Sequence, residues 1–303
     1  MNKSEKSLIT GGAGFIGSNL VDRLVGIGHR VIVLDNFVSG KKINLSHHKK
    51  KNVKIIRVDV SKSKNLDKYF RGVDYVFHLA GLAEIVPSIK YPRKYFKNNV
   101  HGTLNVIEAA KKVGIKKFIY AASSSCYGIP KNYPTSEKEK IDTKHPYAST
   151  KYLGEELVMM YASIFNMPNI SFRFFNVYGP RLNTSGQYSA VFGNFLKQKT
   201  TKKPLTIVGN GKQTRDFIHV EDLTSVFVKI IKINLVNKVY NLGSGKETSI
   251  NKIANLFGGK KIFISKRLGD PNRSCANISK IKKDINWSPK ITIQEGIKRL
   301  LEY

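Results

Sequence analysis

The segment PYASTKY (146–152) holds a tyrosine and, four residues later, a lysine: Tyr147 and Lys151. In a helix that begins after Pro146, the two side chains lie one turn apart on the same face. An ammonium group close to a phenol stabilises the phenolate, so this pair could act as a base near neutral pH. Tyr-x-x-x-Lys also arises by chance, so the elements that surround the pair must decide whether it does chemistry.

A hydroxyl partner is available in KFIYAASSSCYG, where a strand-like run ends in Ser123, Ser124 and Ser125. Polar side chains at the carboxyl end of a buried parallel strand lie at the edge of the sheet where α/β proteins bind ligands. We therefore expect a serine hydroxyl close to the tyrosine.

The segment ITGGAGFIGSNL follows the first strand pattern directly and opens a helix. It can be read as Gly12-x-Gly14-x-x-Gly17 or as Gly11-x-x-Gly14-x-x-Gly17. Glycines here tighten the turn and bring backbone N–H groups and a helix N-terminus close to a diphosphate. The spacing predicts a dinucleotide site.

Two acids stand where such a site needs them. Asp35 ends the second strand pattern, VIVLDN, and a carboxylate there accepts from both ribose hydroxyls and repels a 2′-phosphate, which favours NAD over NADP. Asp59 ends the third pattern, RVDV, and would lie beside the adenine; a purely structural role for Asp59 stays open.

The elements that must position these residues alternate between β-branched runs and helical patterns over the first two-thirds of the chain. Near-continuous apolar strands are buried on both faces, so the pattern predicts an α/β fold with a Rossmann-type, doubly wound parallel sheet. The expected strands are SLITGG, RVIVLDN, VKIIRVDV, VDYVFHLAG, KFIYAASS and ISFRFFNVYG. The expected helices in this part include 18–27, 99–113 and 148–165.

After Pro180 the pattern is looser. It contains helices near 193–198, from Glu221 and over 293–301, and strands in LTIVG and KVYNLG. We expect a smaller, discontinuous C-terminal lobe that binds the substrate. The predicted domains are 1–178 with 215–244 for the dinucleotide and 179–214 with 245–303 for the substrate.

The formal net charge of +31 suggests a nucleic-acid partner. The lysines are scattered without a basic-aromatic array, so we interpret them as a solvated surface that attracts anionic substrates and predict no nucleic-acid partner.

Cys126 and Cys275 make no disulfide framework and have no metal spacing. His47 and His48 are adjacent in a lysine-rich loop with no further ligand nearby in the sequence, and we predict no metal site. Apolar runs of strand length and a polar N-terminus predict a cytoplasmic protein without a membrane span.

The chain resembles the extended short-chain dehydrogenase/reductases, and within them the nucleotide-sugar 4-epimerases. The resemblance covers almost the whole chain through TGGAGFIGSNL, LDNFVSG, HLAGLA, NNVHGTLNVIEAA, SSSCYG, PYASTKYLGE, RFFNVYGP, QTRDFIHVEDL, YNLGSG and RLGDPNRSCANISK. It implies that Ser123 is the catalytic hydroxyl, Tyr147 the base, and Lys151 the holder of the phenolate and of the nicotinamide ribose. The NAD-binding residues that it implies are Gly11, Gly14, Phe15, Ile16, Gly17, Asp35, Asn36, Asp59, Val60, Leu79, Ala80, Tyr147 and Lys151.

The same resemblance implies a mechanism in which Tyr147 removes the proton of the sugar C4 hydroxyl while NAD takes the hydride. The 4-keto sugar turns and receives the hydride on its other face. The sugar and its diphosphate would be held by Ser124, Asn176, Arg215, Arg267, Asp270 and Ser274.

Related chemistries of the superfamily stay open. The 4,6-dehydratases carry an Asp-Glu pair after the catalytic hydroxyl, and the UDP-glucuronate decarboxylases usually carry a glutamate at the position of Ser125; this chain has Ser124-Ser125 at these positions. Both differences favour simple epimerisation. Glu84 departs from the small or aliphatic residue expected in GLAEIVPS and keeps a different chemistry or sugar open. A dehydratase or 4-dehydrogenase on the same scaffold and a non-catalytic nucleotide-binding protein are the alternatives.

The position of Ser274 faces the sugar C2 substituent in the family, where a bulky tyrosine excludes N-acetyl groups. A serine there indicates UDP-GlcNAc and UDP-GalNAc as substrates, with UDP-glucose and UDP-galactose as further candidates and GDP or dTDP sugars still open.

Helices over 99–114 and 148–165 keep apolar positions beyond those needed to pack on a sheet. In the family this pair of helices forms a four-helix interface, so we expect a homodimer.

Overall fold

The computed structural model describes residues 4–63, 65–184, 191–265 and 271–303, and within them the chain forms two compact units. The first unit contains residues 1–126, 143–173 and 224–240, and the second contains 127–142, 174–223 and 241–303. The unit limits differ from the expected domain limits chiefly at 127–142 and 215–223, which lie in the second unit. The domain division expected from the sequence stays a proposal.

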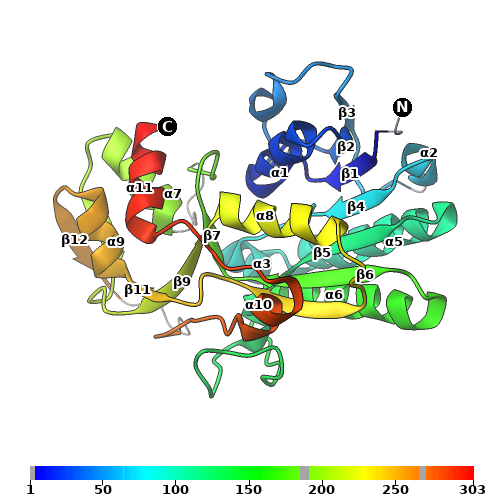
Figure 1. The fold of residues 1–303 in the computed structure, drawn as a ribbon. Helices are drawn as coiled ribbons and strands as arrows, with labels where there is room; N and C mark the ends of the chain where they lie inside the picture. Colours follow the sequence, from blue (N-terminus) through cyan, green and yellow to red (C-terminus); the bar gives the residue numbers. More distant parts are fainter. Residues whose placement is uncertain (1–3, 64, 185–190, 266–270) are drawn as a thin grey trace. The chain divides into compact units, whose positions relative to one another are not determined.

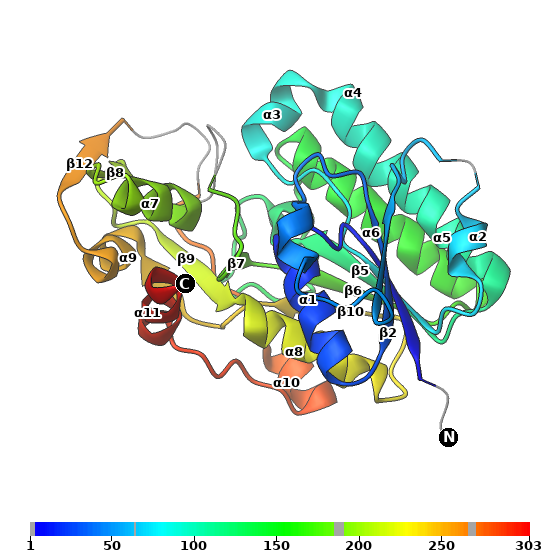
Figure 2. The same ribbon diagram turned by 90° about the horizontal axis from the view of Figure 1, so that it is seen from above.

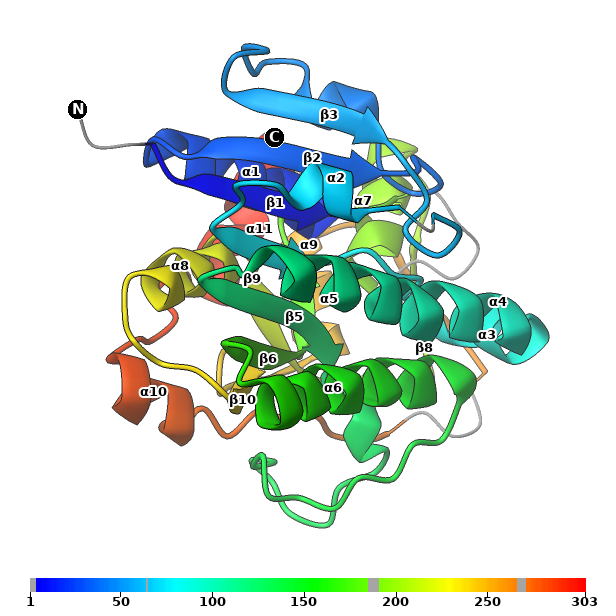
Figure 3. The same cartoon turned by 90° about the vertical axis from the view of Figure 1, so that its right-hand side faces the viewer.

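A seven-stranded sheet forms the centre of the first unit as far as it is described (Figure 1). In spatial order its strands are β10 (Lys238–Leu242), β6 (Asn169–Phe174), β5 (Lys117–Ser123), β4 (Tyr75–His78), β1 (Lys6–Thr10), β2 (Arg30–Asp35) and β3 (Val53–Arg57). Pairing is parallel from β5 through β4 and β1 to β2 and β3. Figure 3 shows this order from β3 across to β10. The Rossmann-type fold expected from the alternating pattern is confirmed.

Helices cover both faces of this sheet. On one face α5 (Gly102–Val113) and α6 (Pro146–Phe165) lie side by side, and α1 (Phe15–Gly26) and α8 (Val220–Ile231) lie on the other face (Figure 2). Because successive strand residues point to opposite faces, Val76 packs with α5 and α6, whereas the neighbouring Phe77 contacts the Phe227 ring of α8. The strands are apolar on both faces because both faces are covered.

Shorter helices complete the connections of this unit. They are η1 (Lys42–Leu45), α2 (Asp67–Phe70), α3 (Ile85–Lys90), α4 (Pro92–Tyr95), the π-helix η2 (Phe96–His101) and η3 (Ser124–Tyr127). The expected helix over 99–113 therefore begins as a π-helix and continues as α5. Helix α6 matches the expected helix over 148–165, and Pro146 occupies its first turn, where a proline costs no hydrogen bond.

The second unit contains two small sheets and their helices. One sheet has the order β11 (Glu247–Ser249), β9 (Thr214–His219), β7 (Asn176–Tyr178), and the other pairs β12 (Lys261–Ile264) with β8 (Leu205–Val208). The helices of this unit are α7 (Val191–Thr200), α9 (Ile250–Phe257), α10 (Ser279–Ile285) and α11 (Ile293–Glu302). A core of Phe192, Phe195, Ile253, Phe257 and Ile297 joins α7, α9 and α11. The expected strand ISFRFFNVYG is divided at Phe175, since β6 belongs to the large sheet and β7 to the small one.

Candidate active site

The turn after β1 has the shape that a dinucleotide diphosphate needs. Gly11 adopts a φ of 70°, and a Cβ on it would lie 2.9 Å from the Ala80 Cα. A Cβ on Gly17 would collide with the carbonyl oxygen of Gly11. Gly14 caps α1, and among the described residues no side chain accepts from the N–H groups of its first turn, which begins with Phe15 and Ile16. These free N–H groups, and the close approach that the glycines allow because they have no Cβ, together suit an anion.

Asp35 lies at the end of β2, almost fully buried against this turn. Its carboxylate accepts hydrogen bonds from the backbone N–H groups of Ala13, at 2.9 Å, and Phe37, at 2.8 Å. Burial raises the pKa of Asp35, and the two backbone hydrogen bonds offset the rise in part. Each carboxylate oxygen keeps a second acceptor position, so the predicted contact with two ribose hydroxyls is chemically available.

Asp59 follows β3, and hydrogen-bond donors around it hold its carboxylate in place. It accepts from the Ser61 N–H and hydroxyl at 3.0 and 2.7 Å. Burial works to raise the pKa of Asp59, but hydrogen bonds from Ser61 and Asn36 and the charge of Lys62 lower it overall. Val60 is buried beside it, and its carbonyl accepts from Asn105 at 2.8 Å. The structure thus gathers Asn36, Asp59 and Val60 on one edge.

Next to Leu79 and Ala80 lies a buried chain of hydrogen bonds that the sequence motifs do not indicate. Thr103 donates to the Asn99 carbonyl at 2.6 Å, so its oxygen must accept from His78 Nε2, at 2.9 Å. His78 Nδ1 then accepts from the Thr10 hydroxyl at 2.7 Å, and Thr10 accepts from the Ala80 N–H at 3.2 Å. Burial lowers the pKa of His78 to about 3, so the neutral ring that this chain requires is stable. This chain of hydrogen bonds fixes the backbone of Leu79 and Ala80, which the dinucleotide would contact.

Ser123 and Tyr147 are brought together, as the sequence predicts. Ser123 ends β5, and its oxygen accepts from the Ser125 hydroxyl at 2.9 Å and the Ser125 N–H at 3.2 Å. The Ser123 proton is then available for its hydrogen bond with the Tyr147 phenol. Ser125 therefore orients the hydroxyl, a role that the sequence did not indicate. Ser124 lies beside it, half-buried in η3.

Tyr147 lies in the first turn of α6, and its backbone N–H donates to the Ser88 hydroxyl of α3 at 3.1 Å. Burial raises the pKa of Tyr147, and the hydrogen bond with Ser123 lowers it in part. The net direction is opposite to the one that a general base needs. The lowering of the Tyr147 pKa that is expected from Lys151 therefore stays a prediction. It depends on the two cations that would lie closest to the phenolate during turnover, Lys151 and the nicotinamide.

Lys151 is 7% exposed, one turn after Tyr147. Burial lowers the pKa of Lys151 to about 7, and the charge of Glu155 raises it in part. Its Nζ lies 4.5 Å from the centroid of the Tyr120 ring. A lysine with this pKa changes charge near neutral pH, so added negative charge nearby would draw it into the ammonium form.

Asn99 joins the helix that carries the pair to the loop after β4. Its amide donates to Thr150 Oγ1 at 3.0 Å and to the Leu82 carbonyl at 3.0 Å, and it accepts from the Leu82 N–H at 2.8 Å. Its three hydrogen bonds and its complete burial make it a fixed structural link. Glu84 is the N-cap of α3 in the same loop. Burial raises the pKa of Tyr95 to about 12, and the charge of Glu84 adds to the rise.

The substrate residues expected from the resemblance lie largely in the second unit. Asn176 begins β7 and donates to the Asp216 carbonyl at 3.2 Å. Arg215 lies in β9, half-buried, and donates to the Thr214 carbonyl at 2.8 Å. Ser274 lies half-buried in the loop before Cys275. Arg267 and Asp270 lie outside the described residues.

Asp216 holds together the segments that carry these expected substrate residues, and it was not anticipated from the sequence. Its carboxylate accepts from the N–H groups of Ser244, Gly245 and Ala276 at 2.6, 2.9 and 3.0 Å, and from the Ser244 hydroxyl at 2.6 Å. Burial raises the pKa of Asp216 in spite of these bonds. The aspartate thus ties β9 to the loop that carries Ser274. Its fixed place after the arginine in QTRDF was the available signal.

A parallel sheet with a glycine turn, an acid after its second strand and a Ser-Tyr-Lys set defines a dinucleotide-dependent α/β protein of the short-chain dehydrogenase/reductase type. Residues 7–243 match the model of the NAD dependent epimerase/dehydratase family. The chain belongs to this family, and the resemblance inferred from its motifs is confirmed.

Relatives of known activity agree with this placement. A UDP-glucose 4-epimerase of Mycolicibacterium smegmatis is 34% identical, with 98% of each chain covered. UDP-glucuronic acid decarboxylase 1 of Arabidopsis thaliana is 36% identical and covers 99% of this chain and 69% of its own length.

Solved structures give the same picture. A UDP-N-acetylglucosamine 4-epimerase from Methanobrevibacter ruminantium, solved with UDP-N-acetylmuramic acid, superposes with a TM-score of 0.94 at 32% identity and covers 99% of this chain and 98% of its own. A UDP-glucuronic acid 4-epimerase from Bacillus cereus, solved with UDP-glucuronic acid and NAD, gives a TM-score of 0.91 at 31% identity, with 98% of each chain covered.

NAD is the cofactor of this family, and the residues present fit it. The close approach at Gly11 and Gly17, the free N-terminus of α1 and the acceptor Asp35 correspond to a diphosphate and an unphosphorylated ribose. Among the described residues, no helix has both the length and the apolar character to cross a membrane.

Proposed function

We propose that this protein is a NAD-dependent UDP-sugar 4-epimerase. The observation that carries the proposal is the Ser123 hydroxyl close enough to the Tyr147 phenol to lower its pKa, with Lys151 one helical turn further, in a chain of the epimerase family. When bound, NAD accepts the hydride from the sugar C4 and returns it to the opposite face.

The side chains divide the proton chemistry between them. Tyr147 takes the proton of the C4 hydroxyl and later returns it, and Ser123 holds the reacting oxygen beside the phenol. Ser125 keeps the Ser123 proton directed at Tyr147 through its own hydrogen bond at 2.9 Å. Lys151, with a pKa of about 7, contributes positive charge close to the phenol and can also bind the ribose hydroxyls.

The sugar is proposed to carry an N-acetyl group at C2. Ser274 is small, and the UDP-N-acetylglucosamine 4-epimerase of Methanobrevibacter ruminantium is among the most similar structures, which supports UDP-GlcNAc and UDP-GalNAc as substrates. Asn176, Arg215, Arg267 and Asp270 would hold the diphosphate and uridine, since arginine suits phosphate oxygens. UDP-glucose and UDP-galactose are the second pair.

Decarboxylation of UDP-glucuronate is the second candidate function, because a decarboxylase of Arabidopsis is 36% identical over nearly the whole chain. Ser125 argues against it. In the family a glutamate usually stands there, and here a short hydroxyl bonds to Ser123 instead.

Proton NMR of the anomeric region separates these functions. Purified protein is incubated with NAD and with UDP-GlcNAc, UDP-glucose or UDP-glucuronate in separate samples. A galacto epimer without net NADH establishes 4-epimerisation; a pentose product, a keto sugar or accumulating NADH would instead assign decarboxylase, dehydratase or dehydrogenase chemistry. Tyr147→Phe should lower turnover by about 10²–10⁴-fold and leave NAD binding intact.

We further propose a cytoplasmic homodimer. Helix α6 exposes Leu153, Met160 and Ile164, seven and four residues apart on one face, and Ile164 is 63% exposed. Helix α3 adds exposed Ile85 and Ile89. A second copy would cover this apolar surface in the α5/α6 arrangement expected from the family. Light scattering that gives the monomer mass at micromolar concentration would contradict it.

A further inference from the structure

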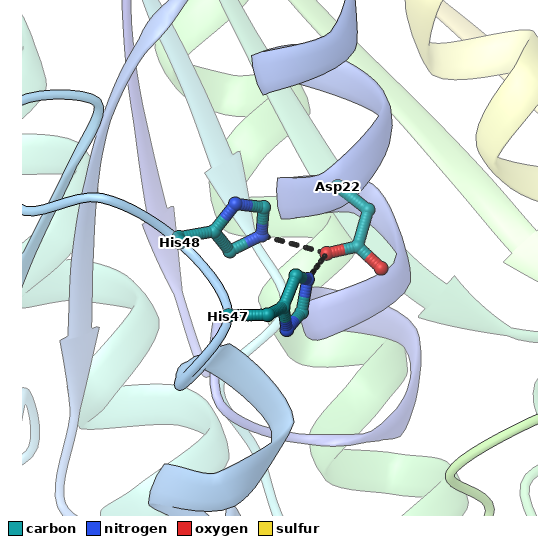
Figure 4. Close-up of side chains that lie close together, drawn as sticks. All are labelled: Asp22, His47 and His48. Carbon is teal, nitrogen blue, oxygen red and sulfur yellow. Dashed lines mark hydrogen bonds and ion pairs between the residues drawn. The ribbon is translucent and has the colours of Figure 1, made fainter.

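The loop between β2 and β3 forms a cluster of metal-ligand groups with α1. His47 Nε2 and His48 Nε2 lie 2.9 and 2.7 Å from the same oxygen of Asp22, and the three ligand atoms lie within 4.8 Å of one another (Figure 4). Asp22 is 25 residues before His47, so only the fold reveals it as the third ligand. The cluster is separate from the proposed catalytic residues.

We propose that Asp22, His47 and His48 bind a zinc ion. Two imidazole nitrogens and a carboxylate oxygen are a donor set that zinc favours, and they leave a fourth position for water. Ligand atoms around a tetrahedral zinc ion lie about 3.4 Å apart, since each bond is about 2.1 Å. The two Asp22–His distances, now 2.9 and 2.7 Å, would lengthen slightly, a change that side-chain rotation can supply.

Burial and exposure in the cluster suit a site that an ion can enter. The His48 side chain is 9% exposed and fixed between the loop and α1, whereas the His47 and Asp22 side chains are 49% and 33% exposed. The rings of His47 and His48 lie with centroids 4.1 Å apart, so both nitrogens already converge on the Asp22 oxygen. Zinc would take the place of the two Nε2 protons that now bridge to this oxygen, and each neutral ring would then carry its proton on Nδ1.

The surrounding charge decides which ion can bind. Lys41, Lys42 and Lys49–Lys51 flank the loop and repel every cation. One carboxylate cannot offset this repulsion for Mg²⁺, which prefers oxygen ligands. The lysines repel both ions alike, but only zinc gains from the two imidazole nitrogen ligands, so we expect selectivity for zinc over magnesium.

A bound ion would tie the loop to α1 beside the dinucleotide turn. The same loop already bonds this turn, since the Lys41 N–H and the Asn44 amide both donate to the Ala13 carbonyl, at 3.0 and 2.9 Å. Zinc would therefore stabilise the folded chain, with no role in the chemical step.

The test is isothermal titration of tag-free protein with zinc chloride, with thermal unfolding in parallel. One zinc per chain and a rise in melting temperature of a few degrees are expected, and magnesium chloride should give neither. His47→Ala and Asp22→Asn should weaken zinc binding at least about tenfold. Asp22→Asn keeps the shape of the side chain and an oxygen acceptor, so it should fold normally, and both variants should keep UDP-sugar turnover.

His101→Ala is the matched control, because His101 is exposed and belongs to η2, outside the cluster. It should bind zinc as the unmodified protein does. Absence of zinc binding, equal binding of magnesium, or zinc binding that Asp22→Asn and His47→Ala both retain in full would overturn the proposal. Loss of epimerase activity in Tyr147→Phe leaves it untouched, so the two proposals fail independently.

Discussion

The Nζ of Lys151 lies over the face of the Tyr120 ring, 4.5 Å from its centroid. Tyr120 is fully buried, and its hydroxyl donates to the backbone carbonyl of Lys151 at 3.3 Å. The aromatic face attracts a cation without requiring a further buried anion. Tyr120 thus supports the charged form of a lysine whose pKa burial lowers to about 7.

Replacing Tyr120 should reveal this support. Tyr120→Leu removes the aromatic face and should lower kcat by about 5–30-fold, the equivalent of about 1–2 kcal/mol for a desolvated cation–π contact. Tyr120→Phe keeps the face and should keep kcat near that of the unmodified enzyme. Steady-state epimerisation assays of both variants check this. Equal losses in the two variants would assign the effect to the hydroxyl and exclude a contribution of the cation–π contact to kcat.

Lys151→Met should stabilise the protein while it abolishes turnover. A cation whose pKa is depressed in the folded state destabilises the protein, and this cost is complete at pH values below the folded pKa. The cost then decreases as the pH rises from the folded pKa to the unfolded pKa. For Lys151 the window runs from about 7 to the ordinary value of 10.5. The gain in the free energy of unfolding should be about 2–4 kcal/mol at pH 7 and about 1–2 kcal/mol smaller at pH 9.

Urea unfolding of Lys151→Met and the unmodified protein at several pH values measures this difference. Lys54→Met is the control, because Lys54 is an exposed lysine on β3. Its difference from the unmodified protein should stay flat with pH. A flat difference for Lys151→Met as well would show that Lys151 stays fully charged in the folded state.

The features that sequence could predict are those written in local spacing. The glycine turn, Asp35 at a strand end, and Tyr147 with Lys151 on one helical face all depend on neighbours within one element or one βα unit. The apolar strands predict a two-faced sheet because both of their faces are covered. These local patterns suffice for the Rossmann fold.

Contacts between distant segments were not predictable in the same way. His78 bonds Thr10 and Thr103, Asn99 bonds Thr150, and Asp216 collects N–H groups from two loops. Each needs the packing of elements that lie 25 to 68 residues apart, and the separate residues have no unusual spacing. The division of ISFRFFNVYG between two sheets likewise follows from the partners of β6 and β7 and cannot be read from its apolar run.

Glu155→Gln should destabilise the first unit strongly. Glu155 and Arg173 form a buried ion pair, 1% and 6% exposed, and Glu155 also accepts from Ser171 at 3.0 Å. Removing one charge leaves the guanidinium buried without its carboxylate, which costs about 3–5 kcal/mol. Urea unfolding measures the loss. The double variant Glu155→Gln with Arg173→Met should lose less than Glu155→Gln alone, and a larger loss in the double variant would mean that Arg173 is stabilised mainly by other groups.

Ser274→Tyr should change which sugar is accepted. Ser274 precedes Cys275 and Ala276, and the Ala276 N–H is fixed to Asp216 at 3.0 Å, so the loop has little freedom to move a larger side chain away. If Ser274 faces the C2 substituent as proposed, a tyrosine ring would occupy the space of the N-acetyl group. UDP-GlcNAc turnover should then fall at least about tenfold while UDP-glucose turnover persists, since a steric conflict of this kind costs about 1–3 kcal/mol.

The ratio of kcat/KM for the two sugars is the quantity to measure, because it cancels losses that both substrates share. Ser274→Ala keeps the small side chain and should leave the ratio unchanged. If UDP-GlcNAc turnover survives Ser274→Tyr intact, Ser274 does not face the C2 substituent and N-acetyl selectivity must arise elsewhere. If both sugars lose activity equally, the variant has disturbed the loop held by Asp216, and the melting temperature of the protein should fall with it.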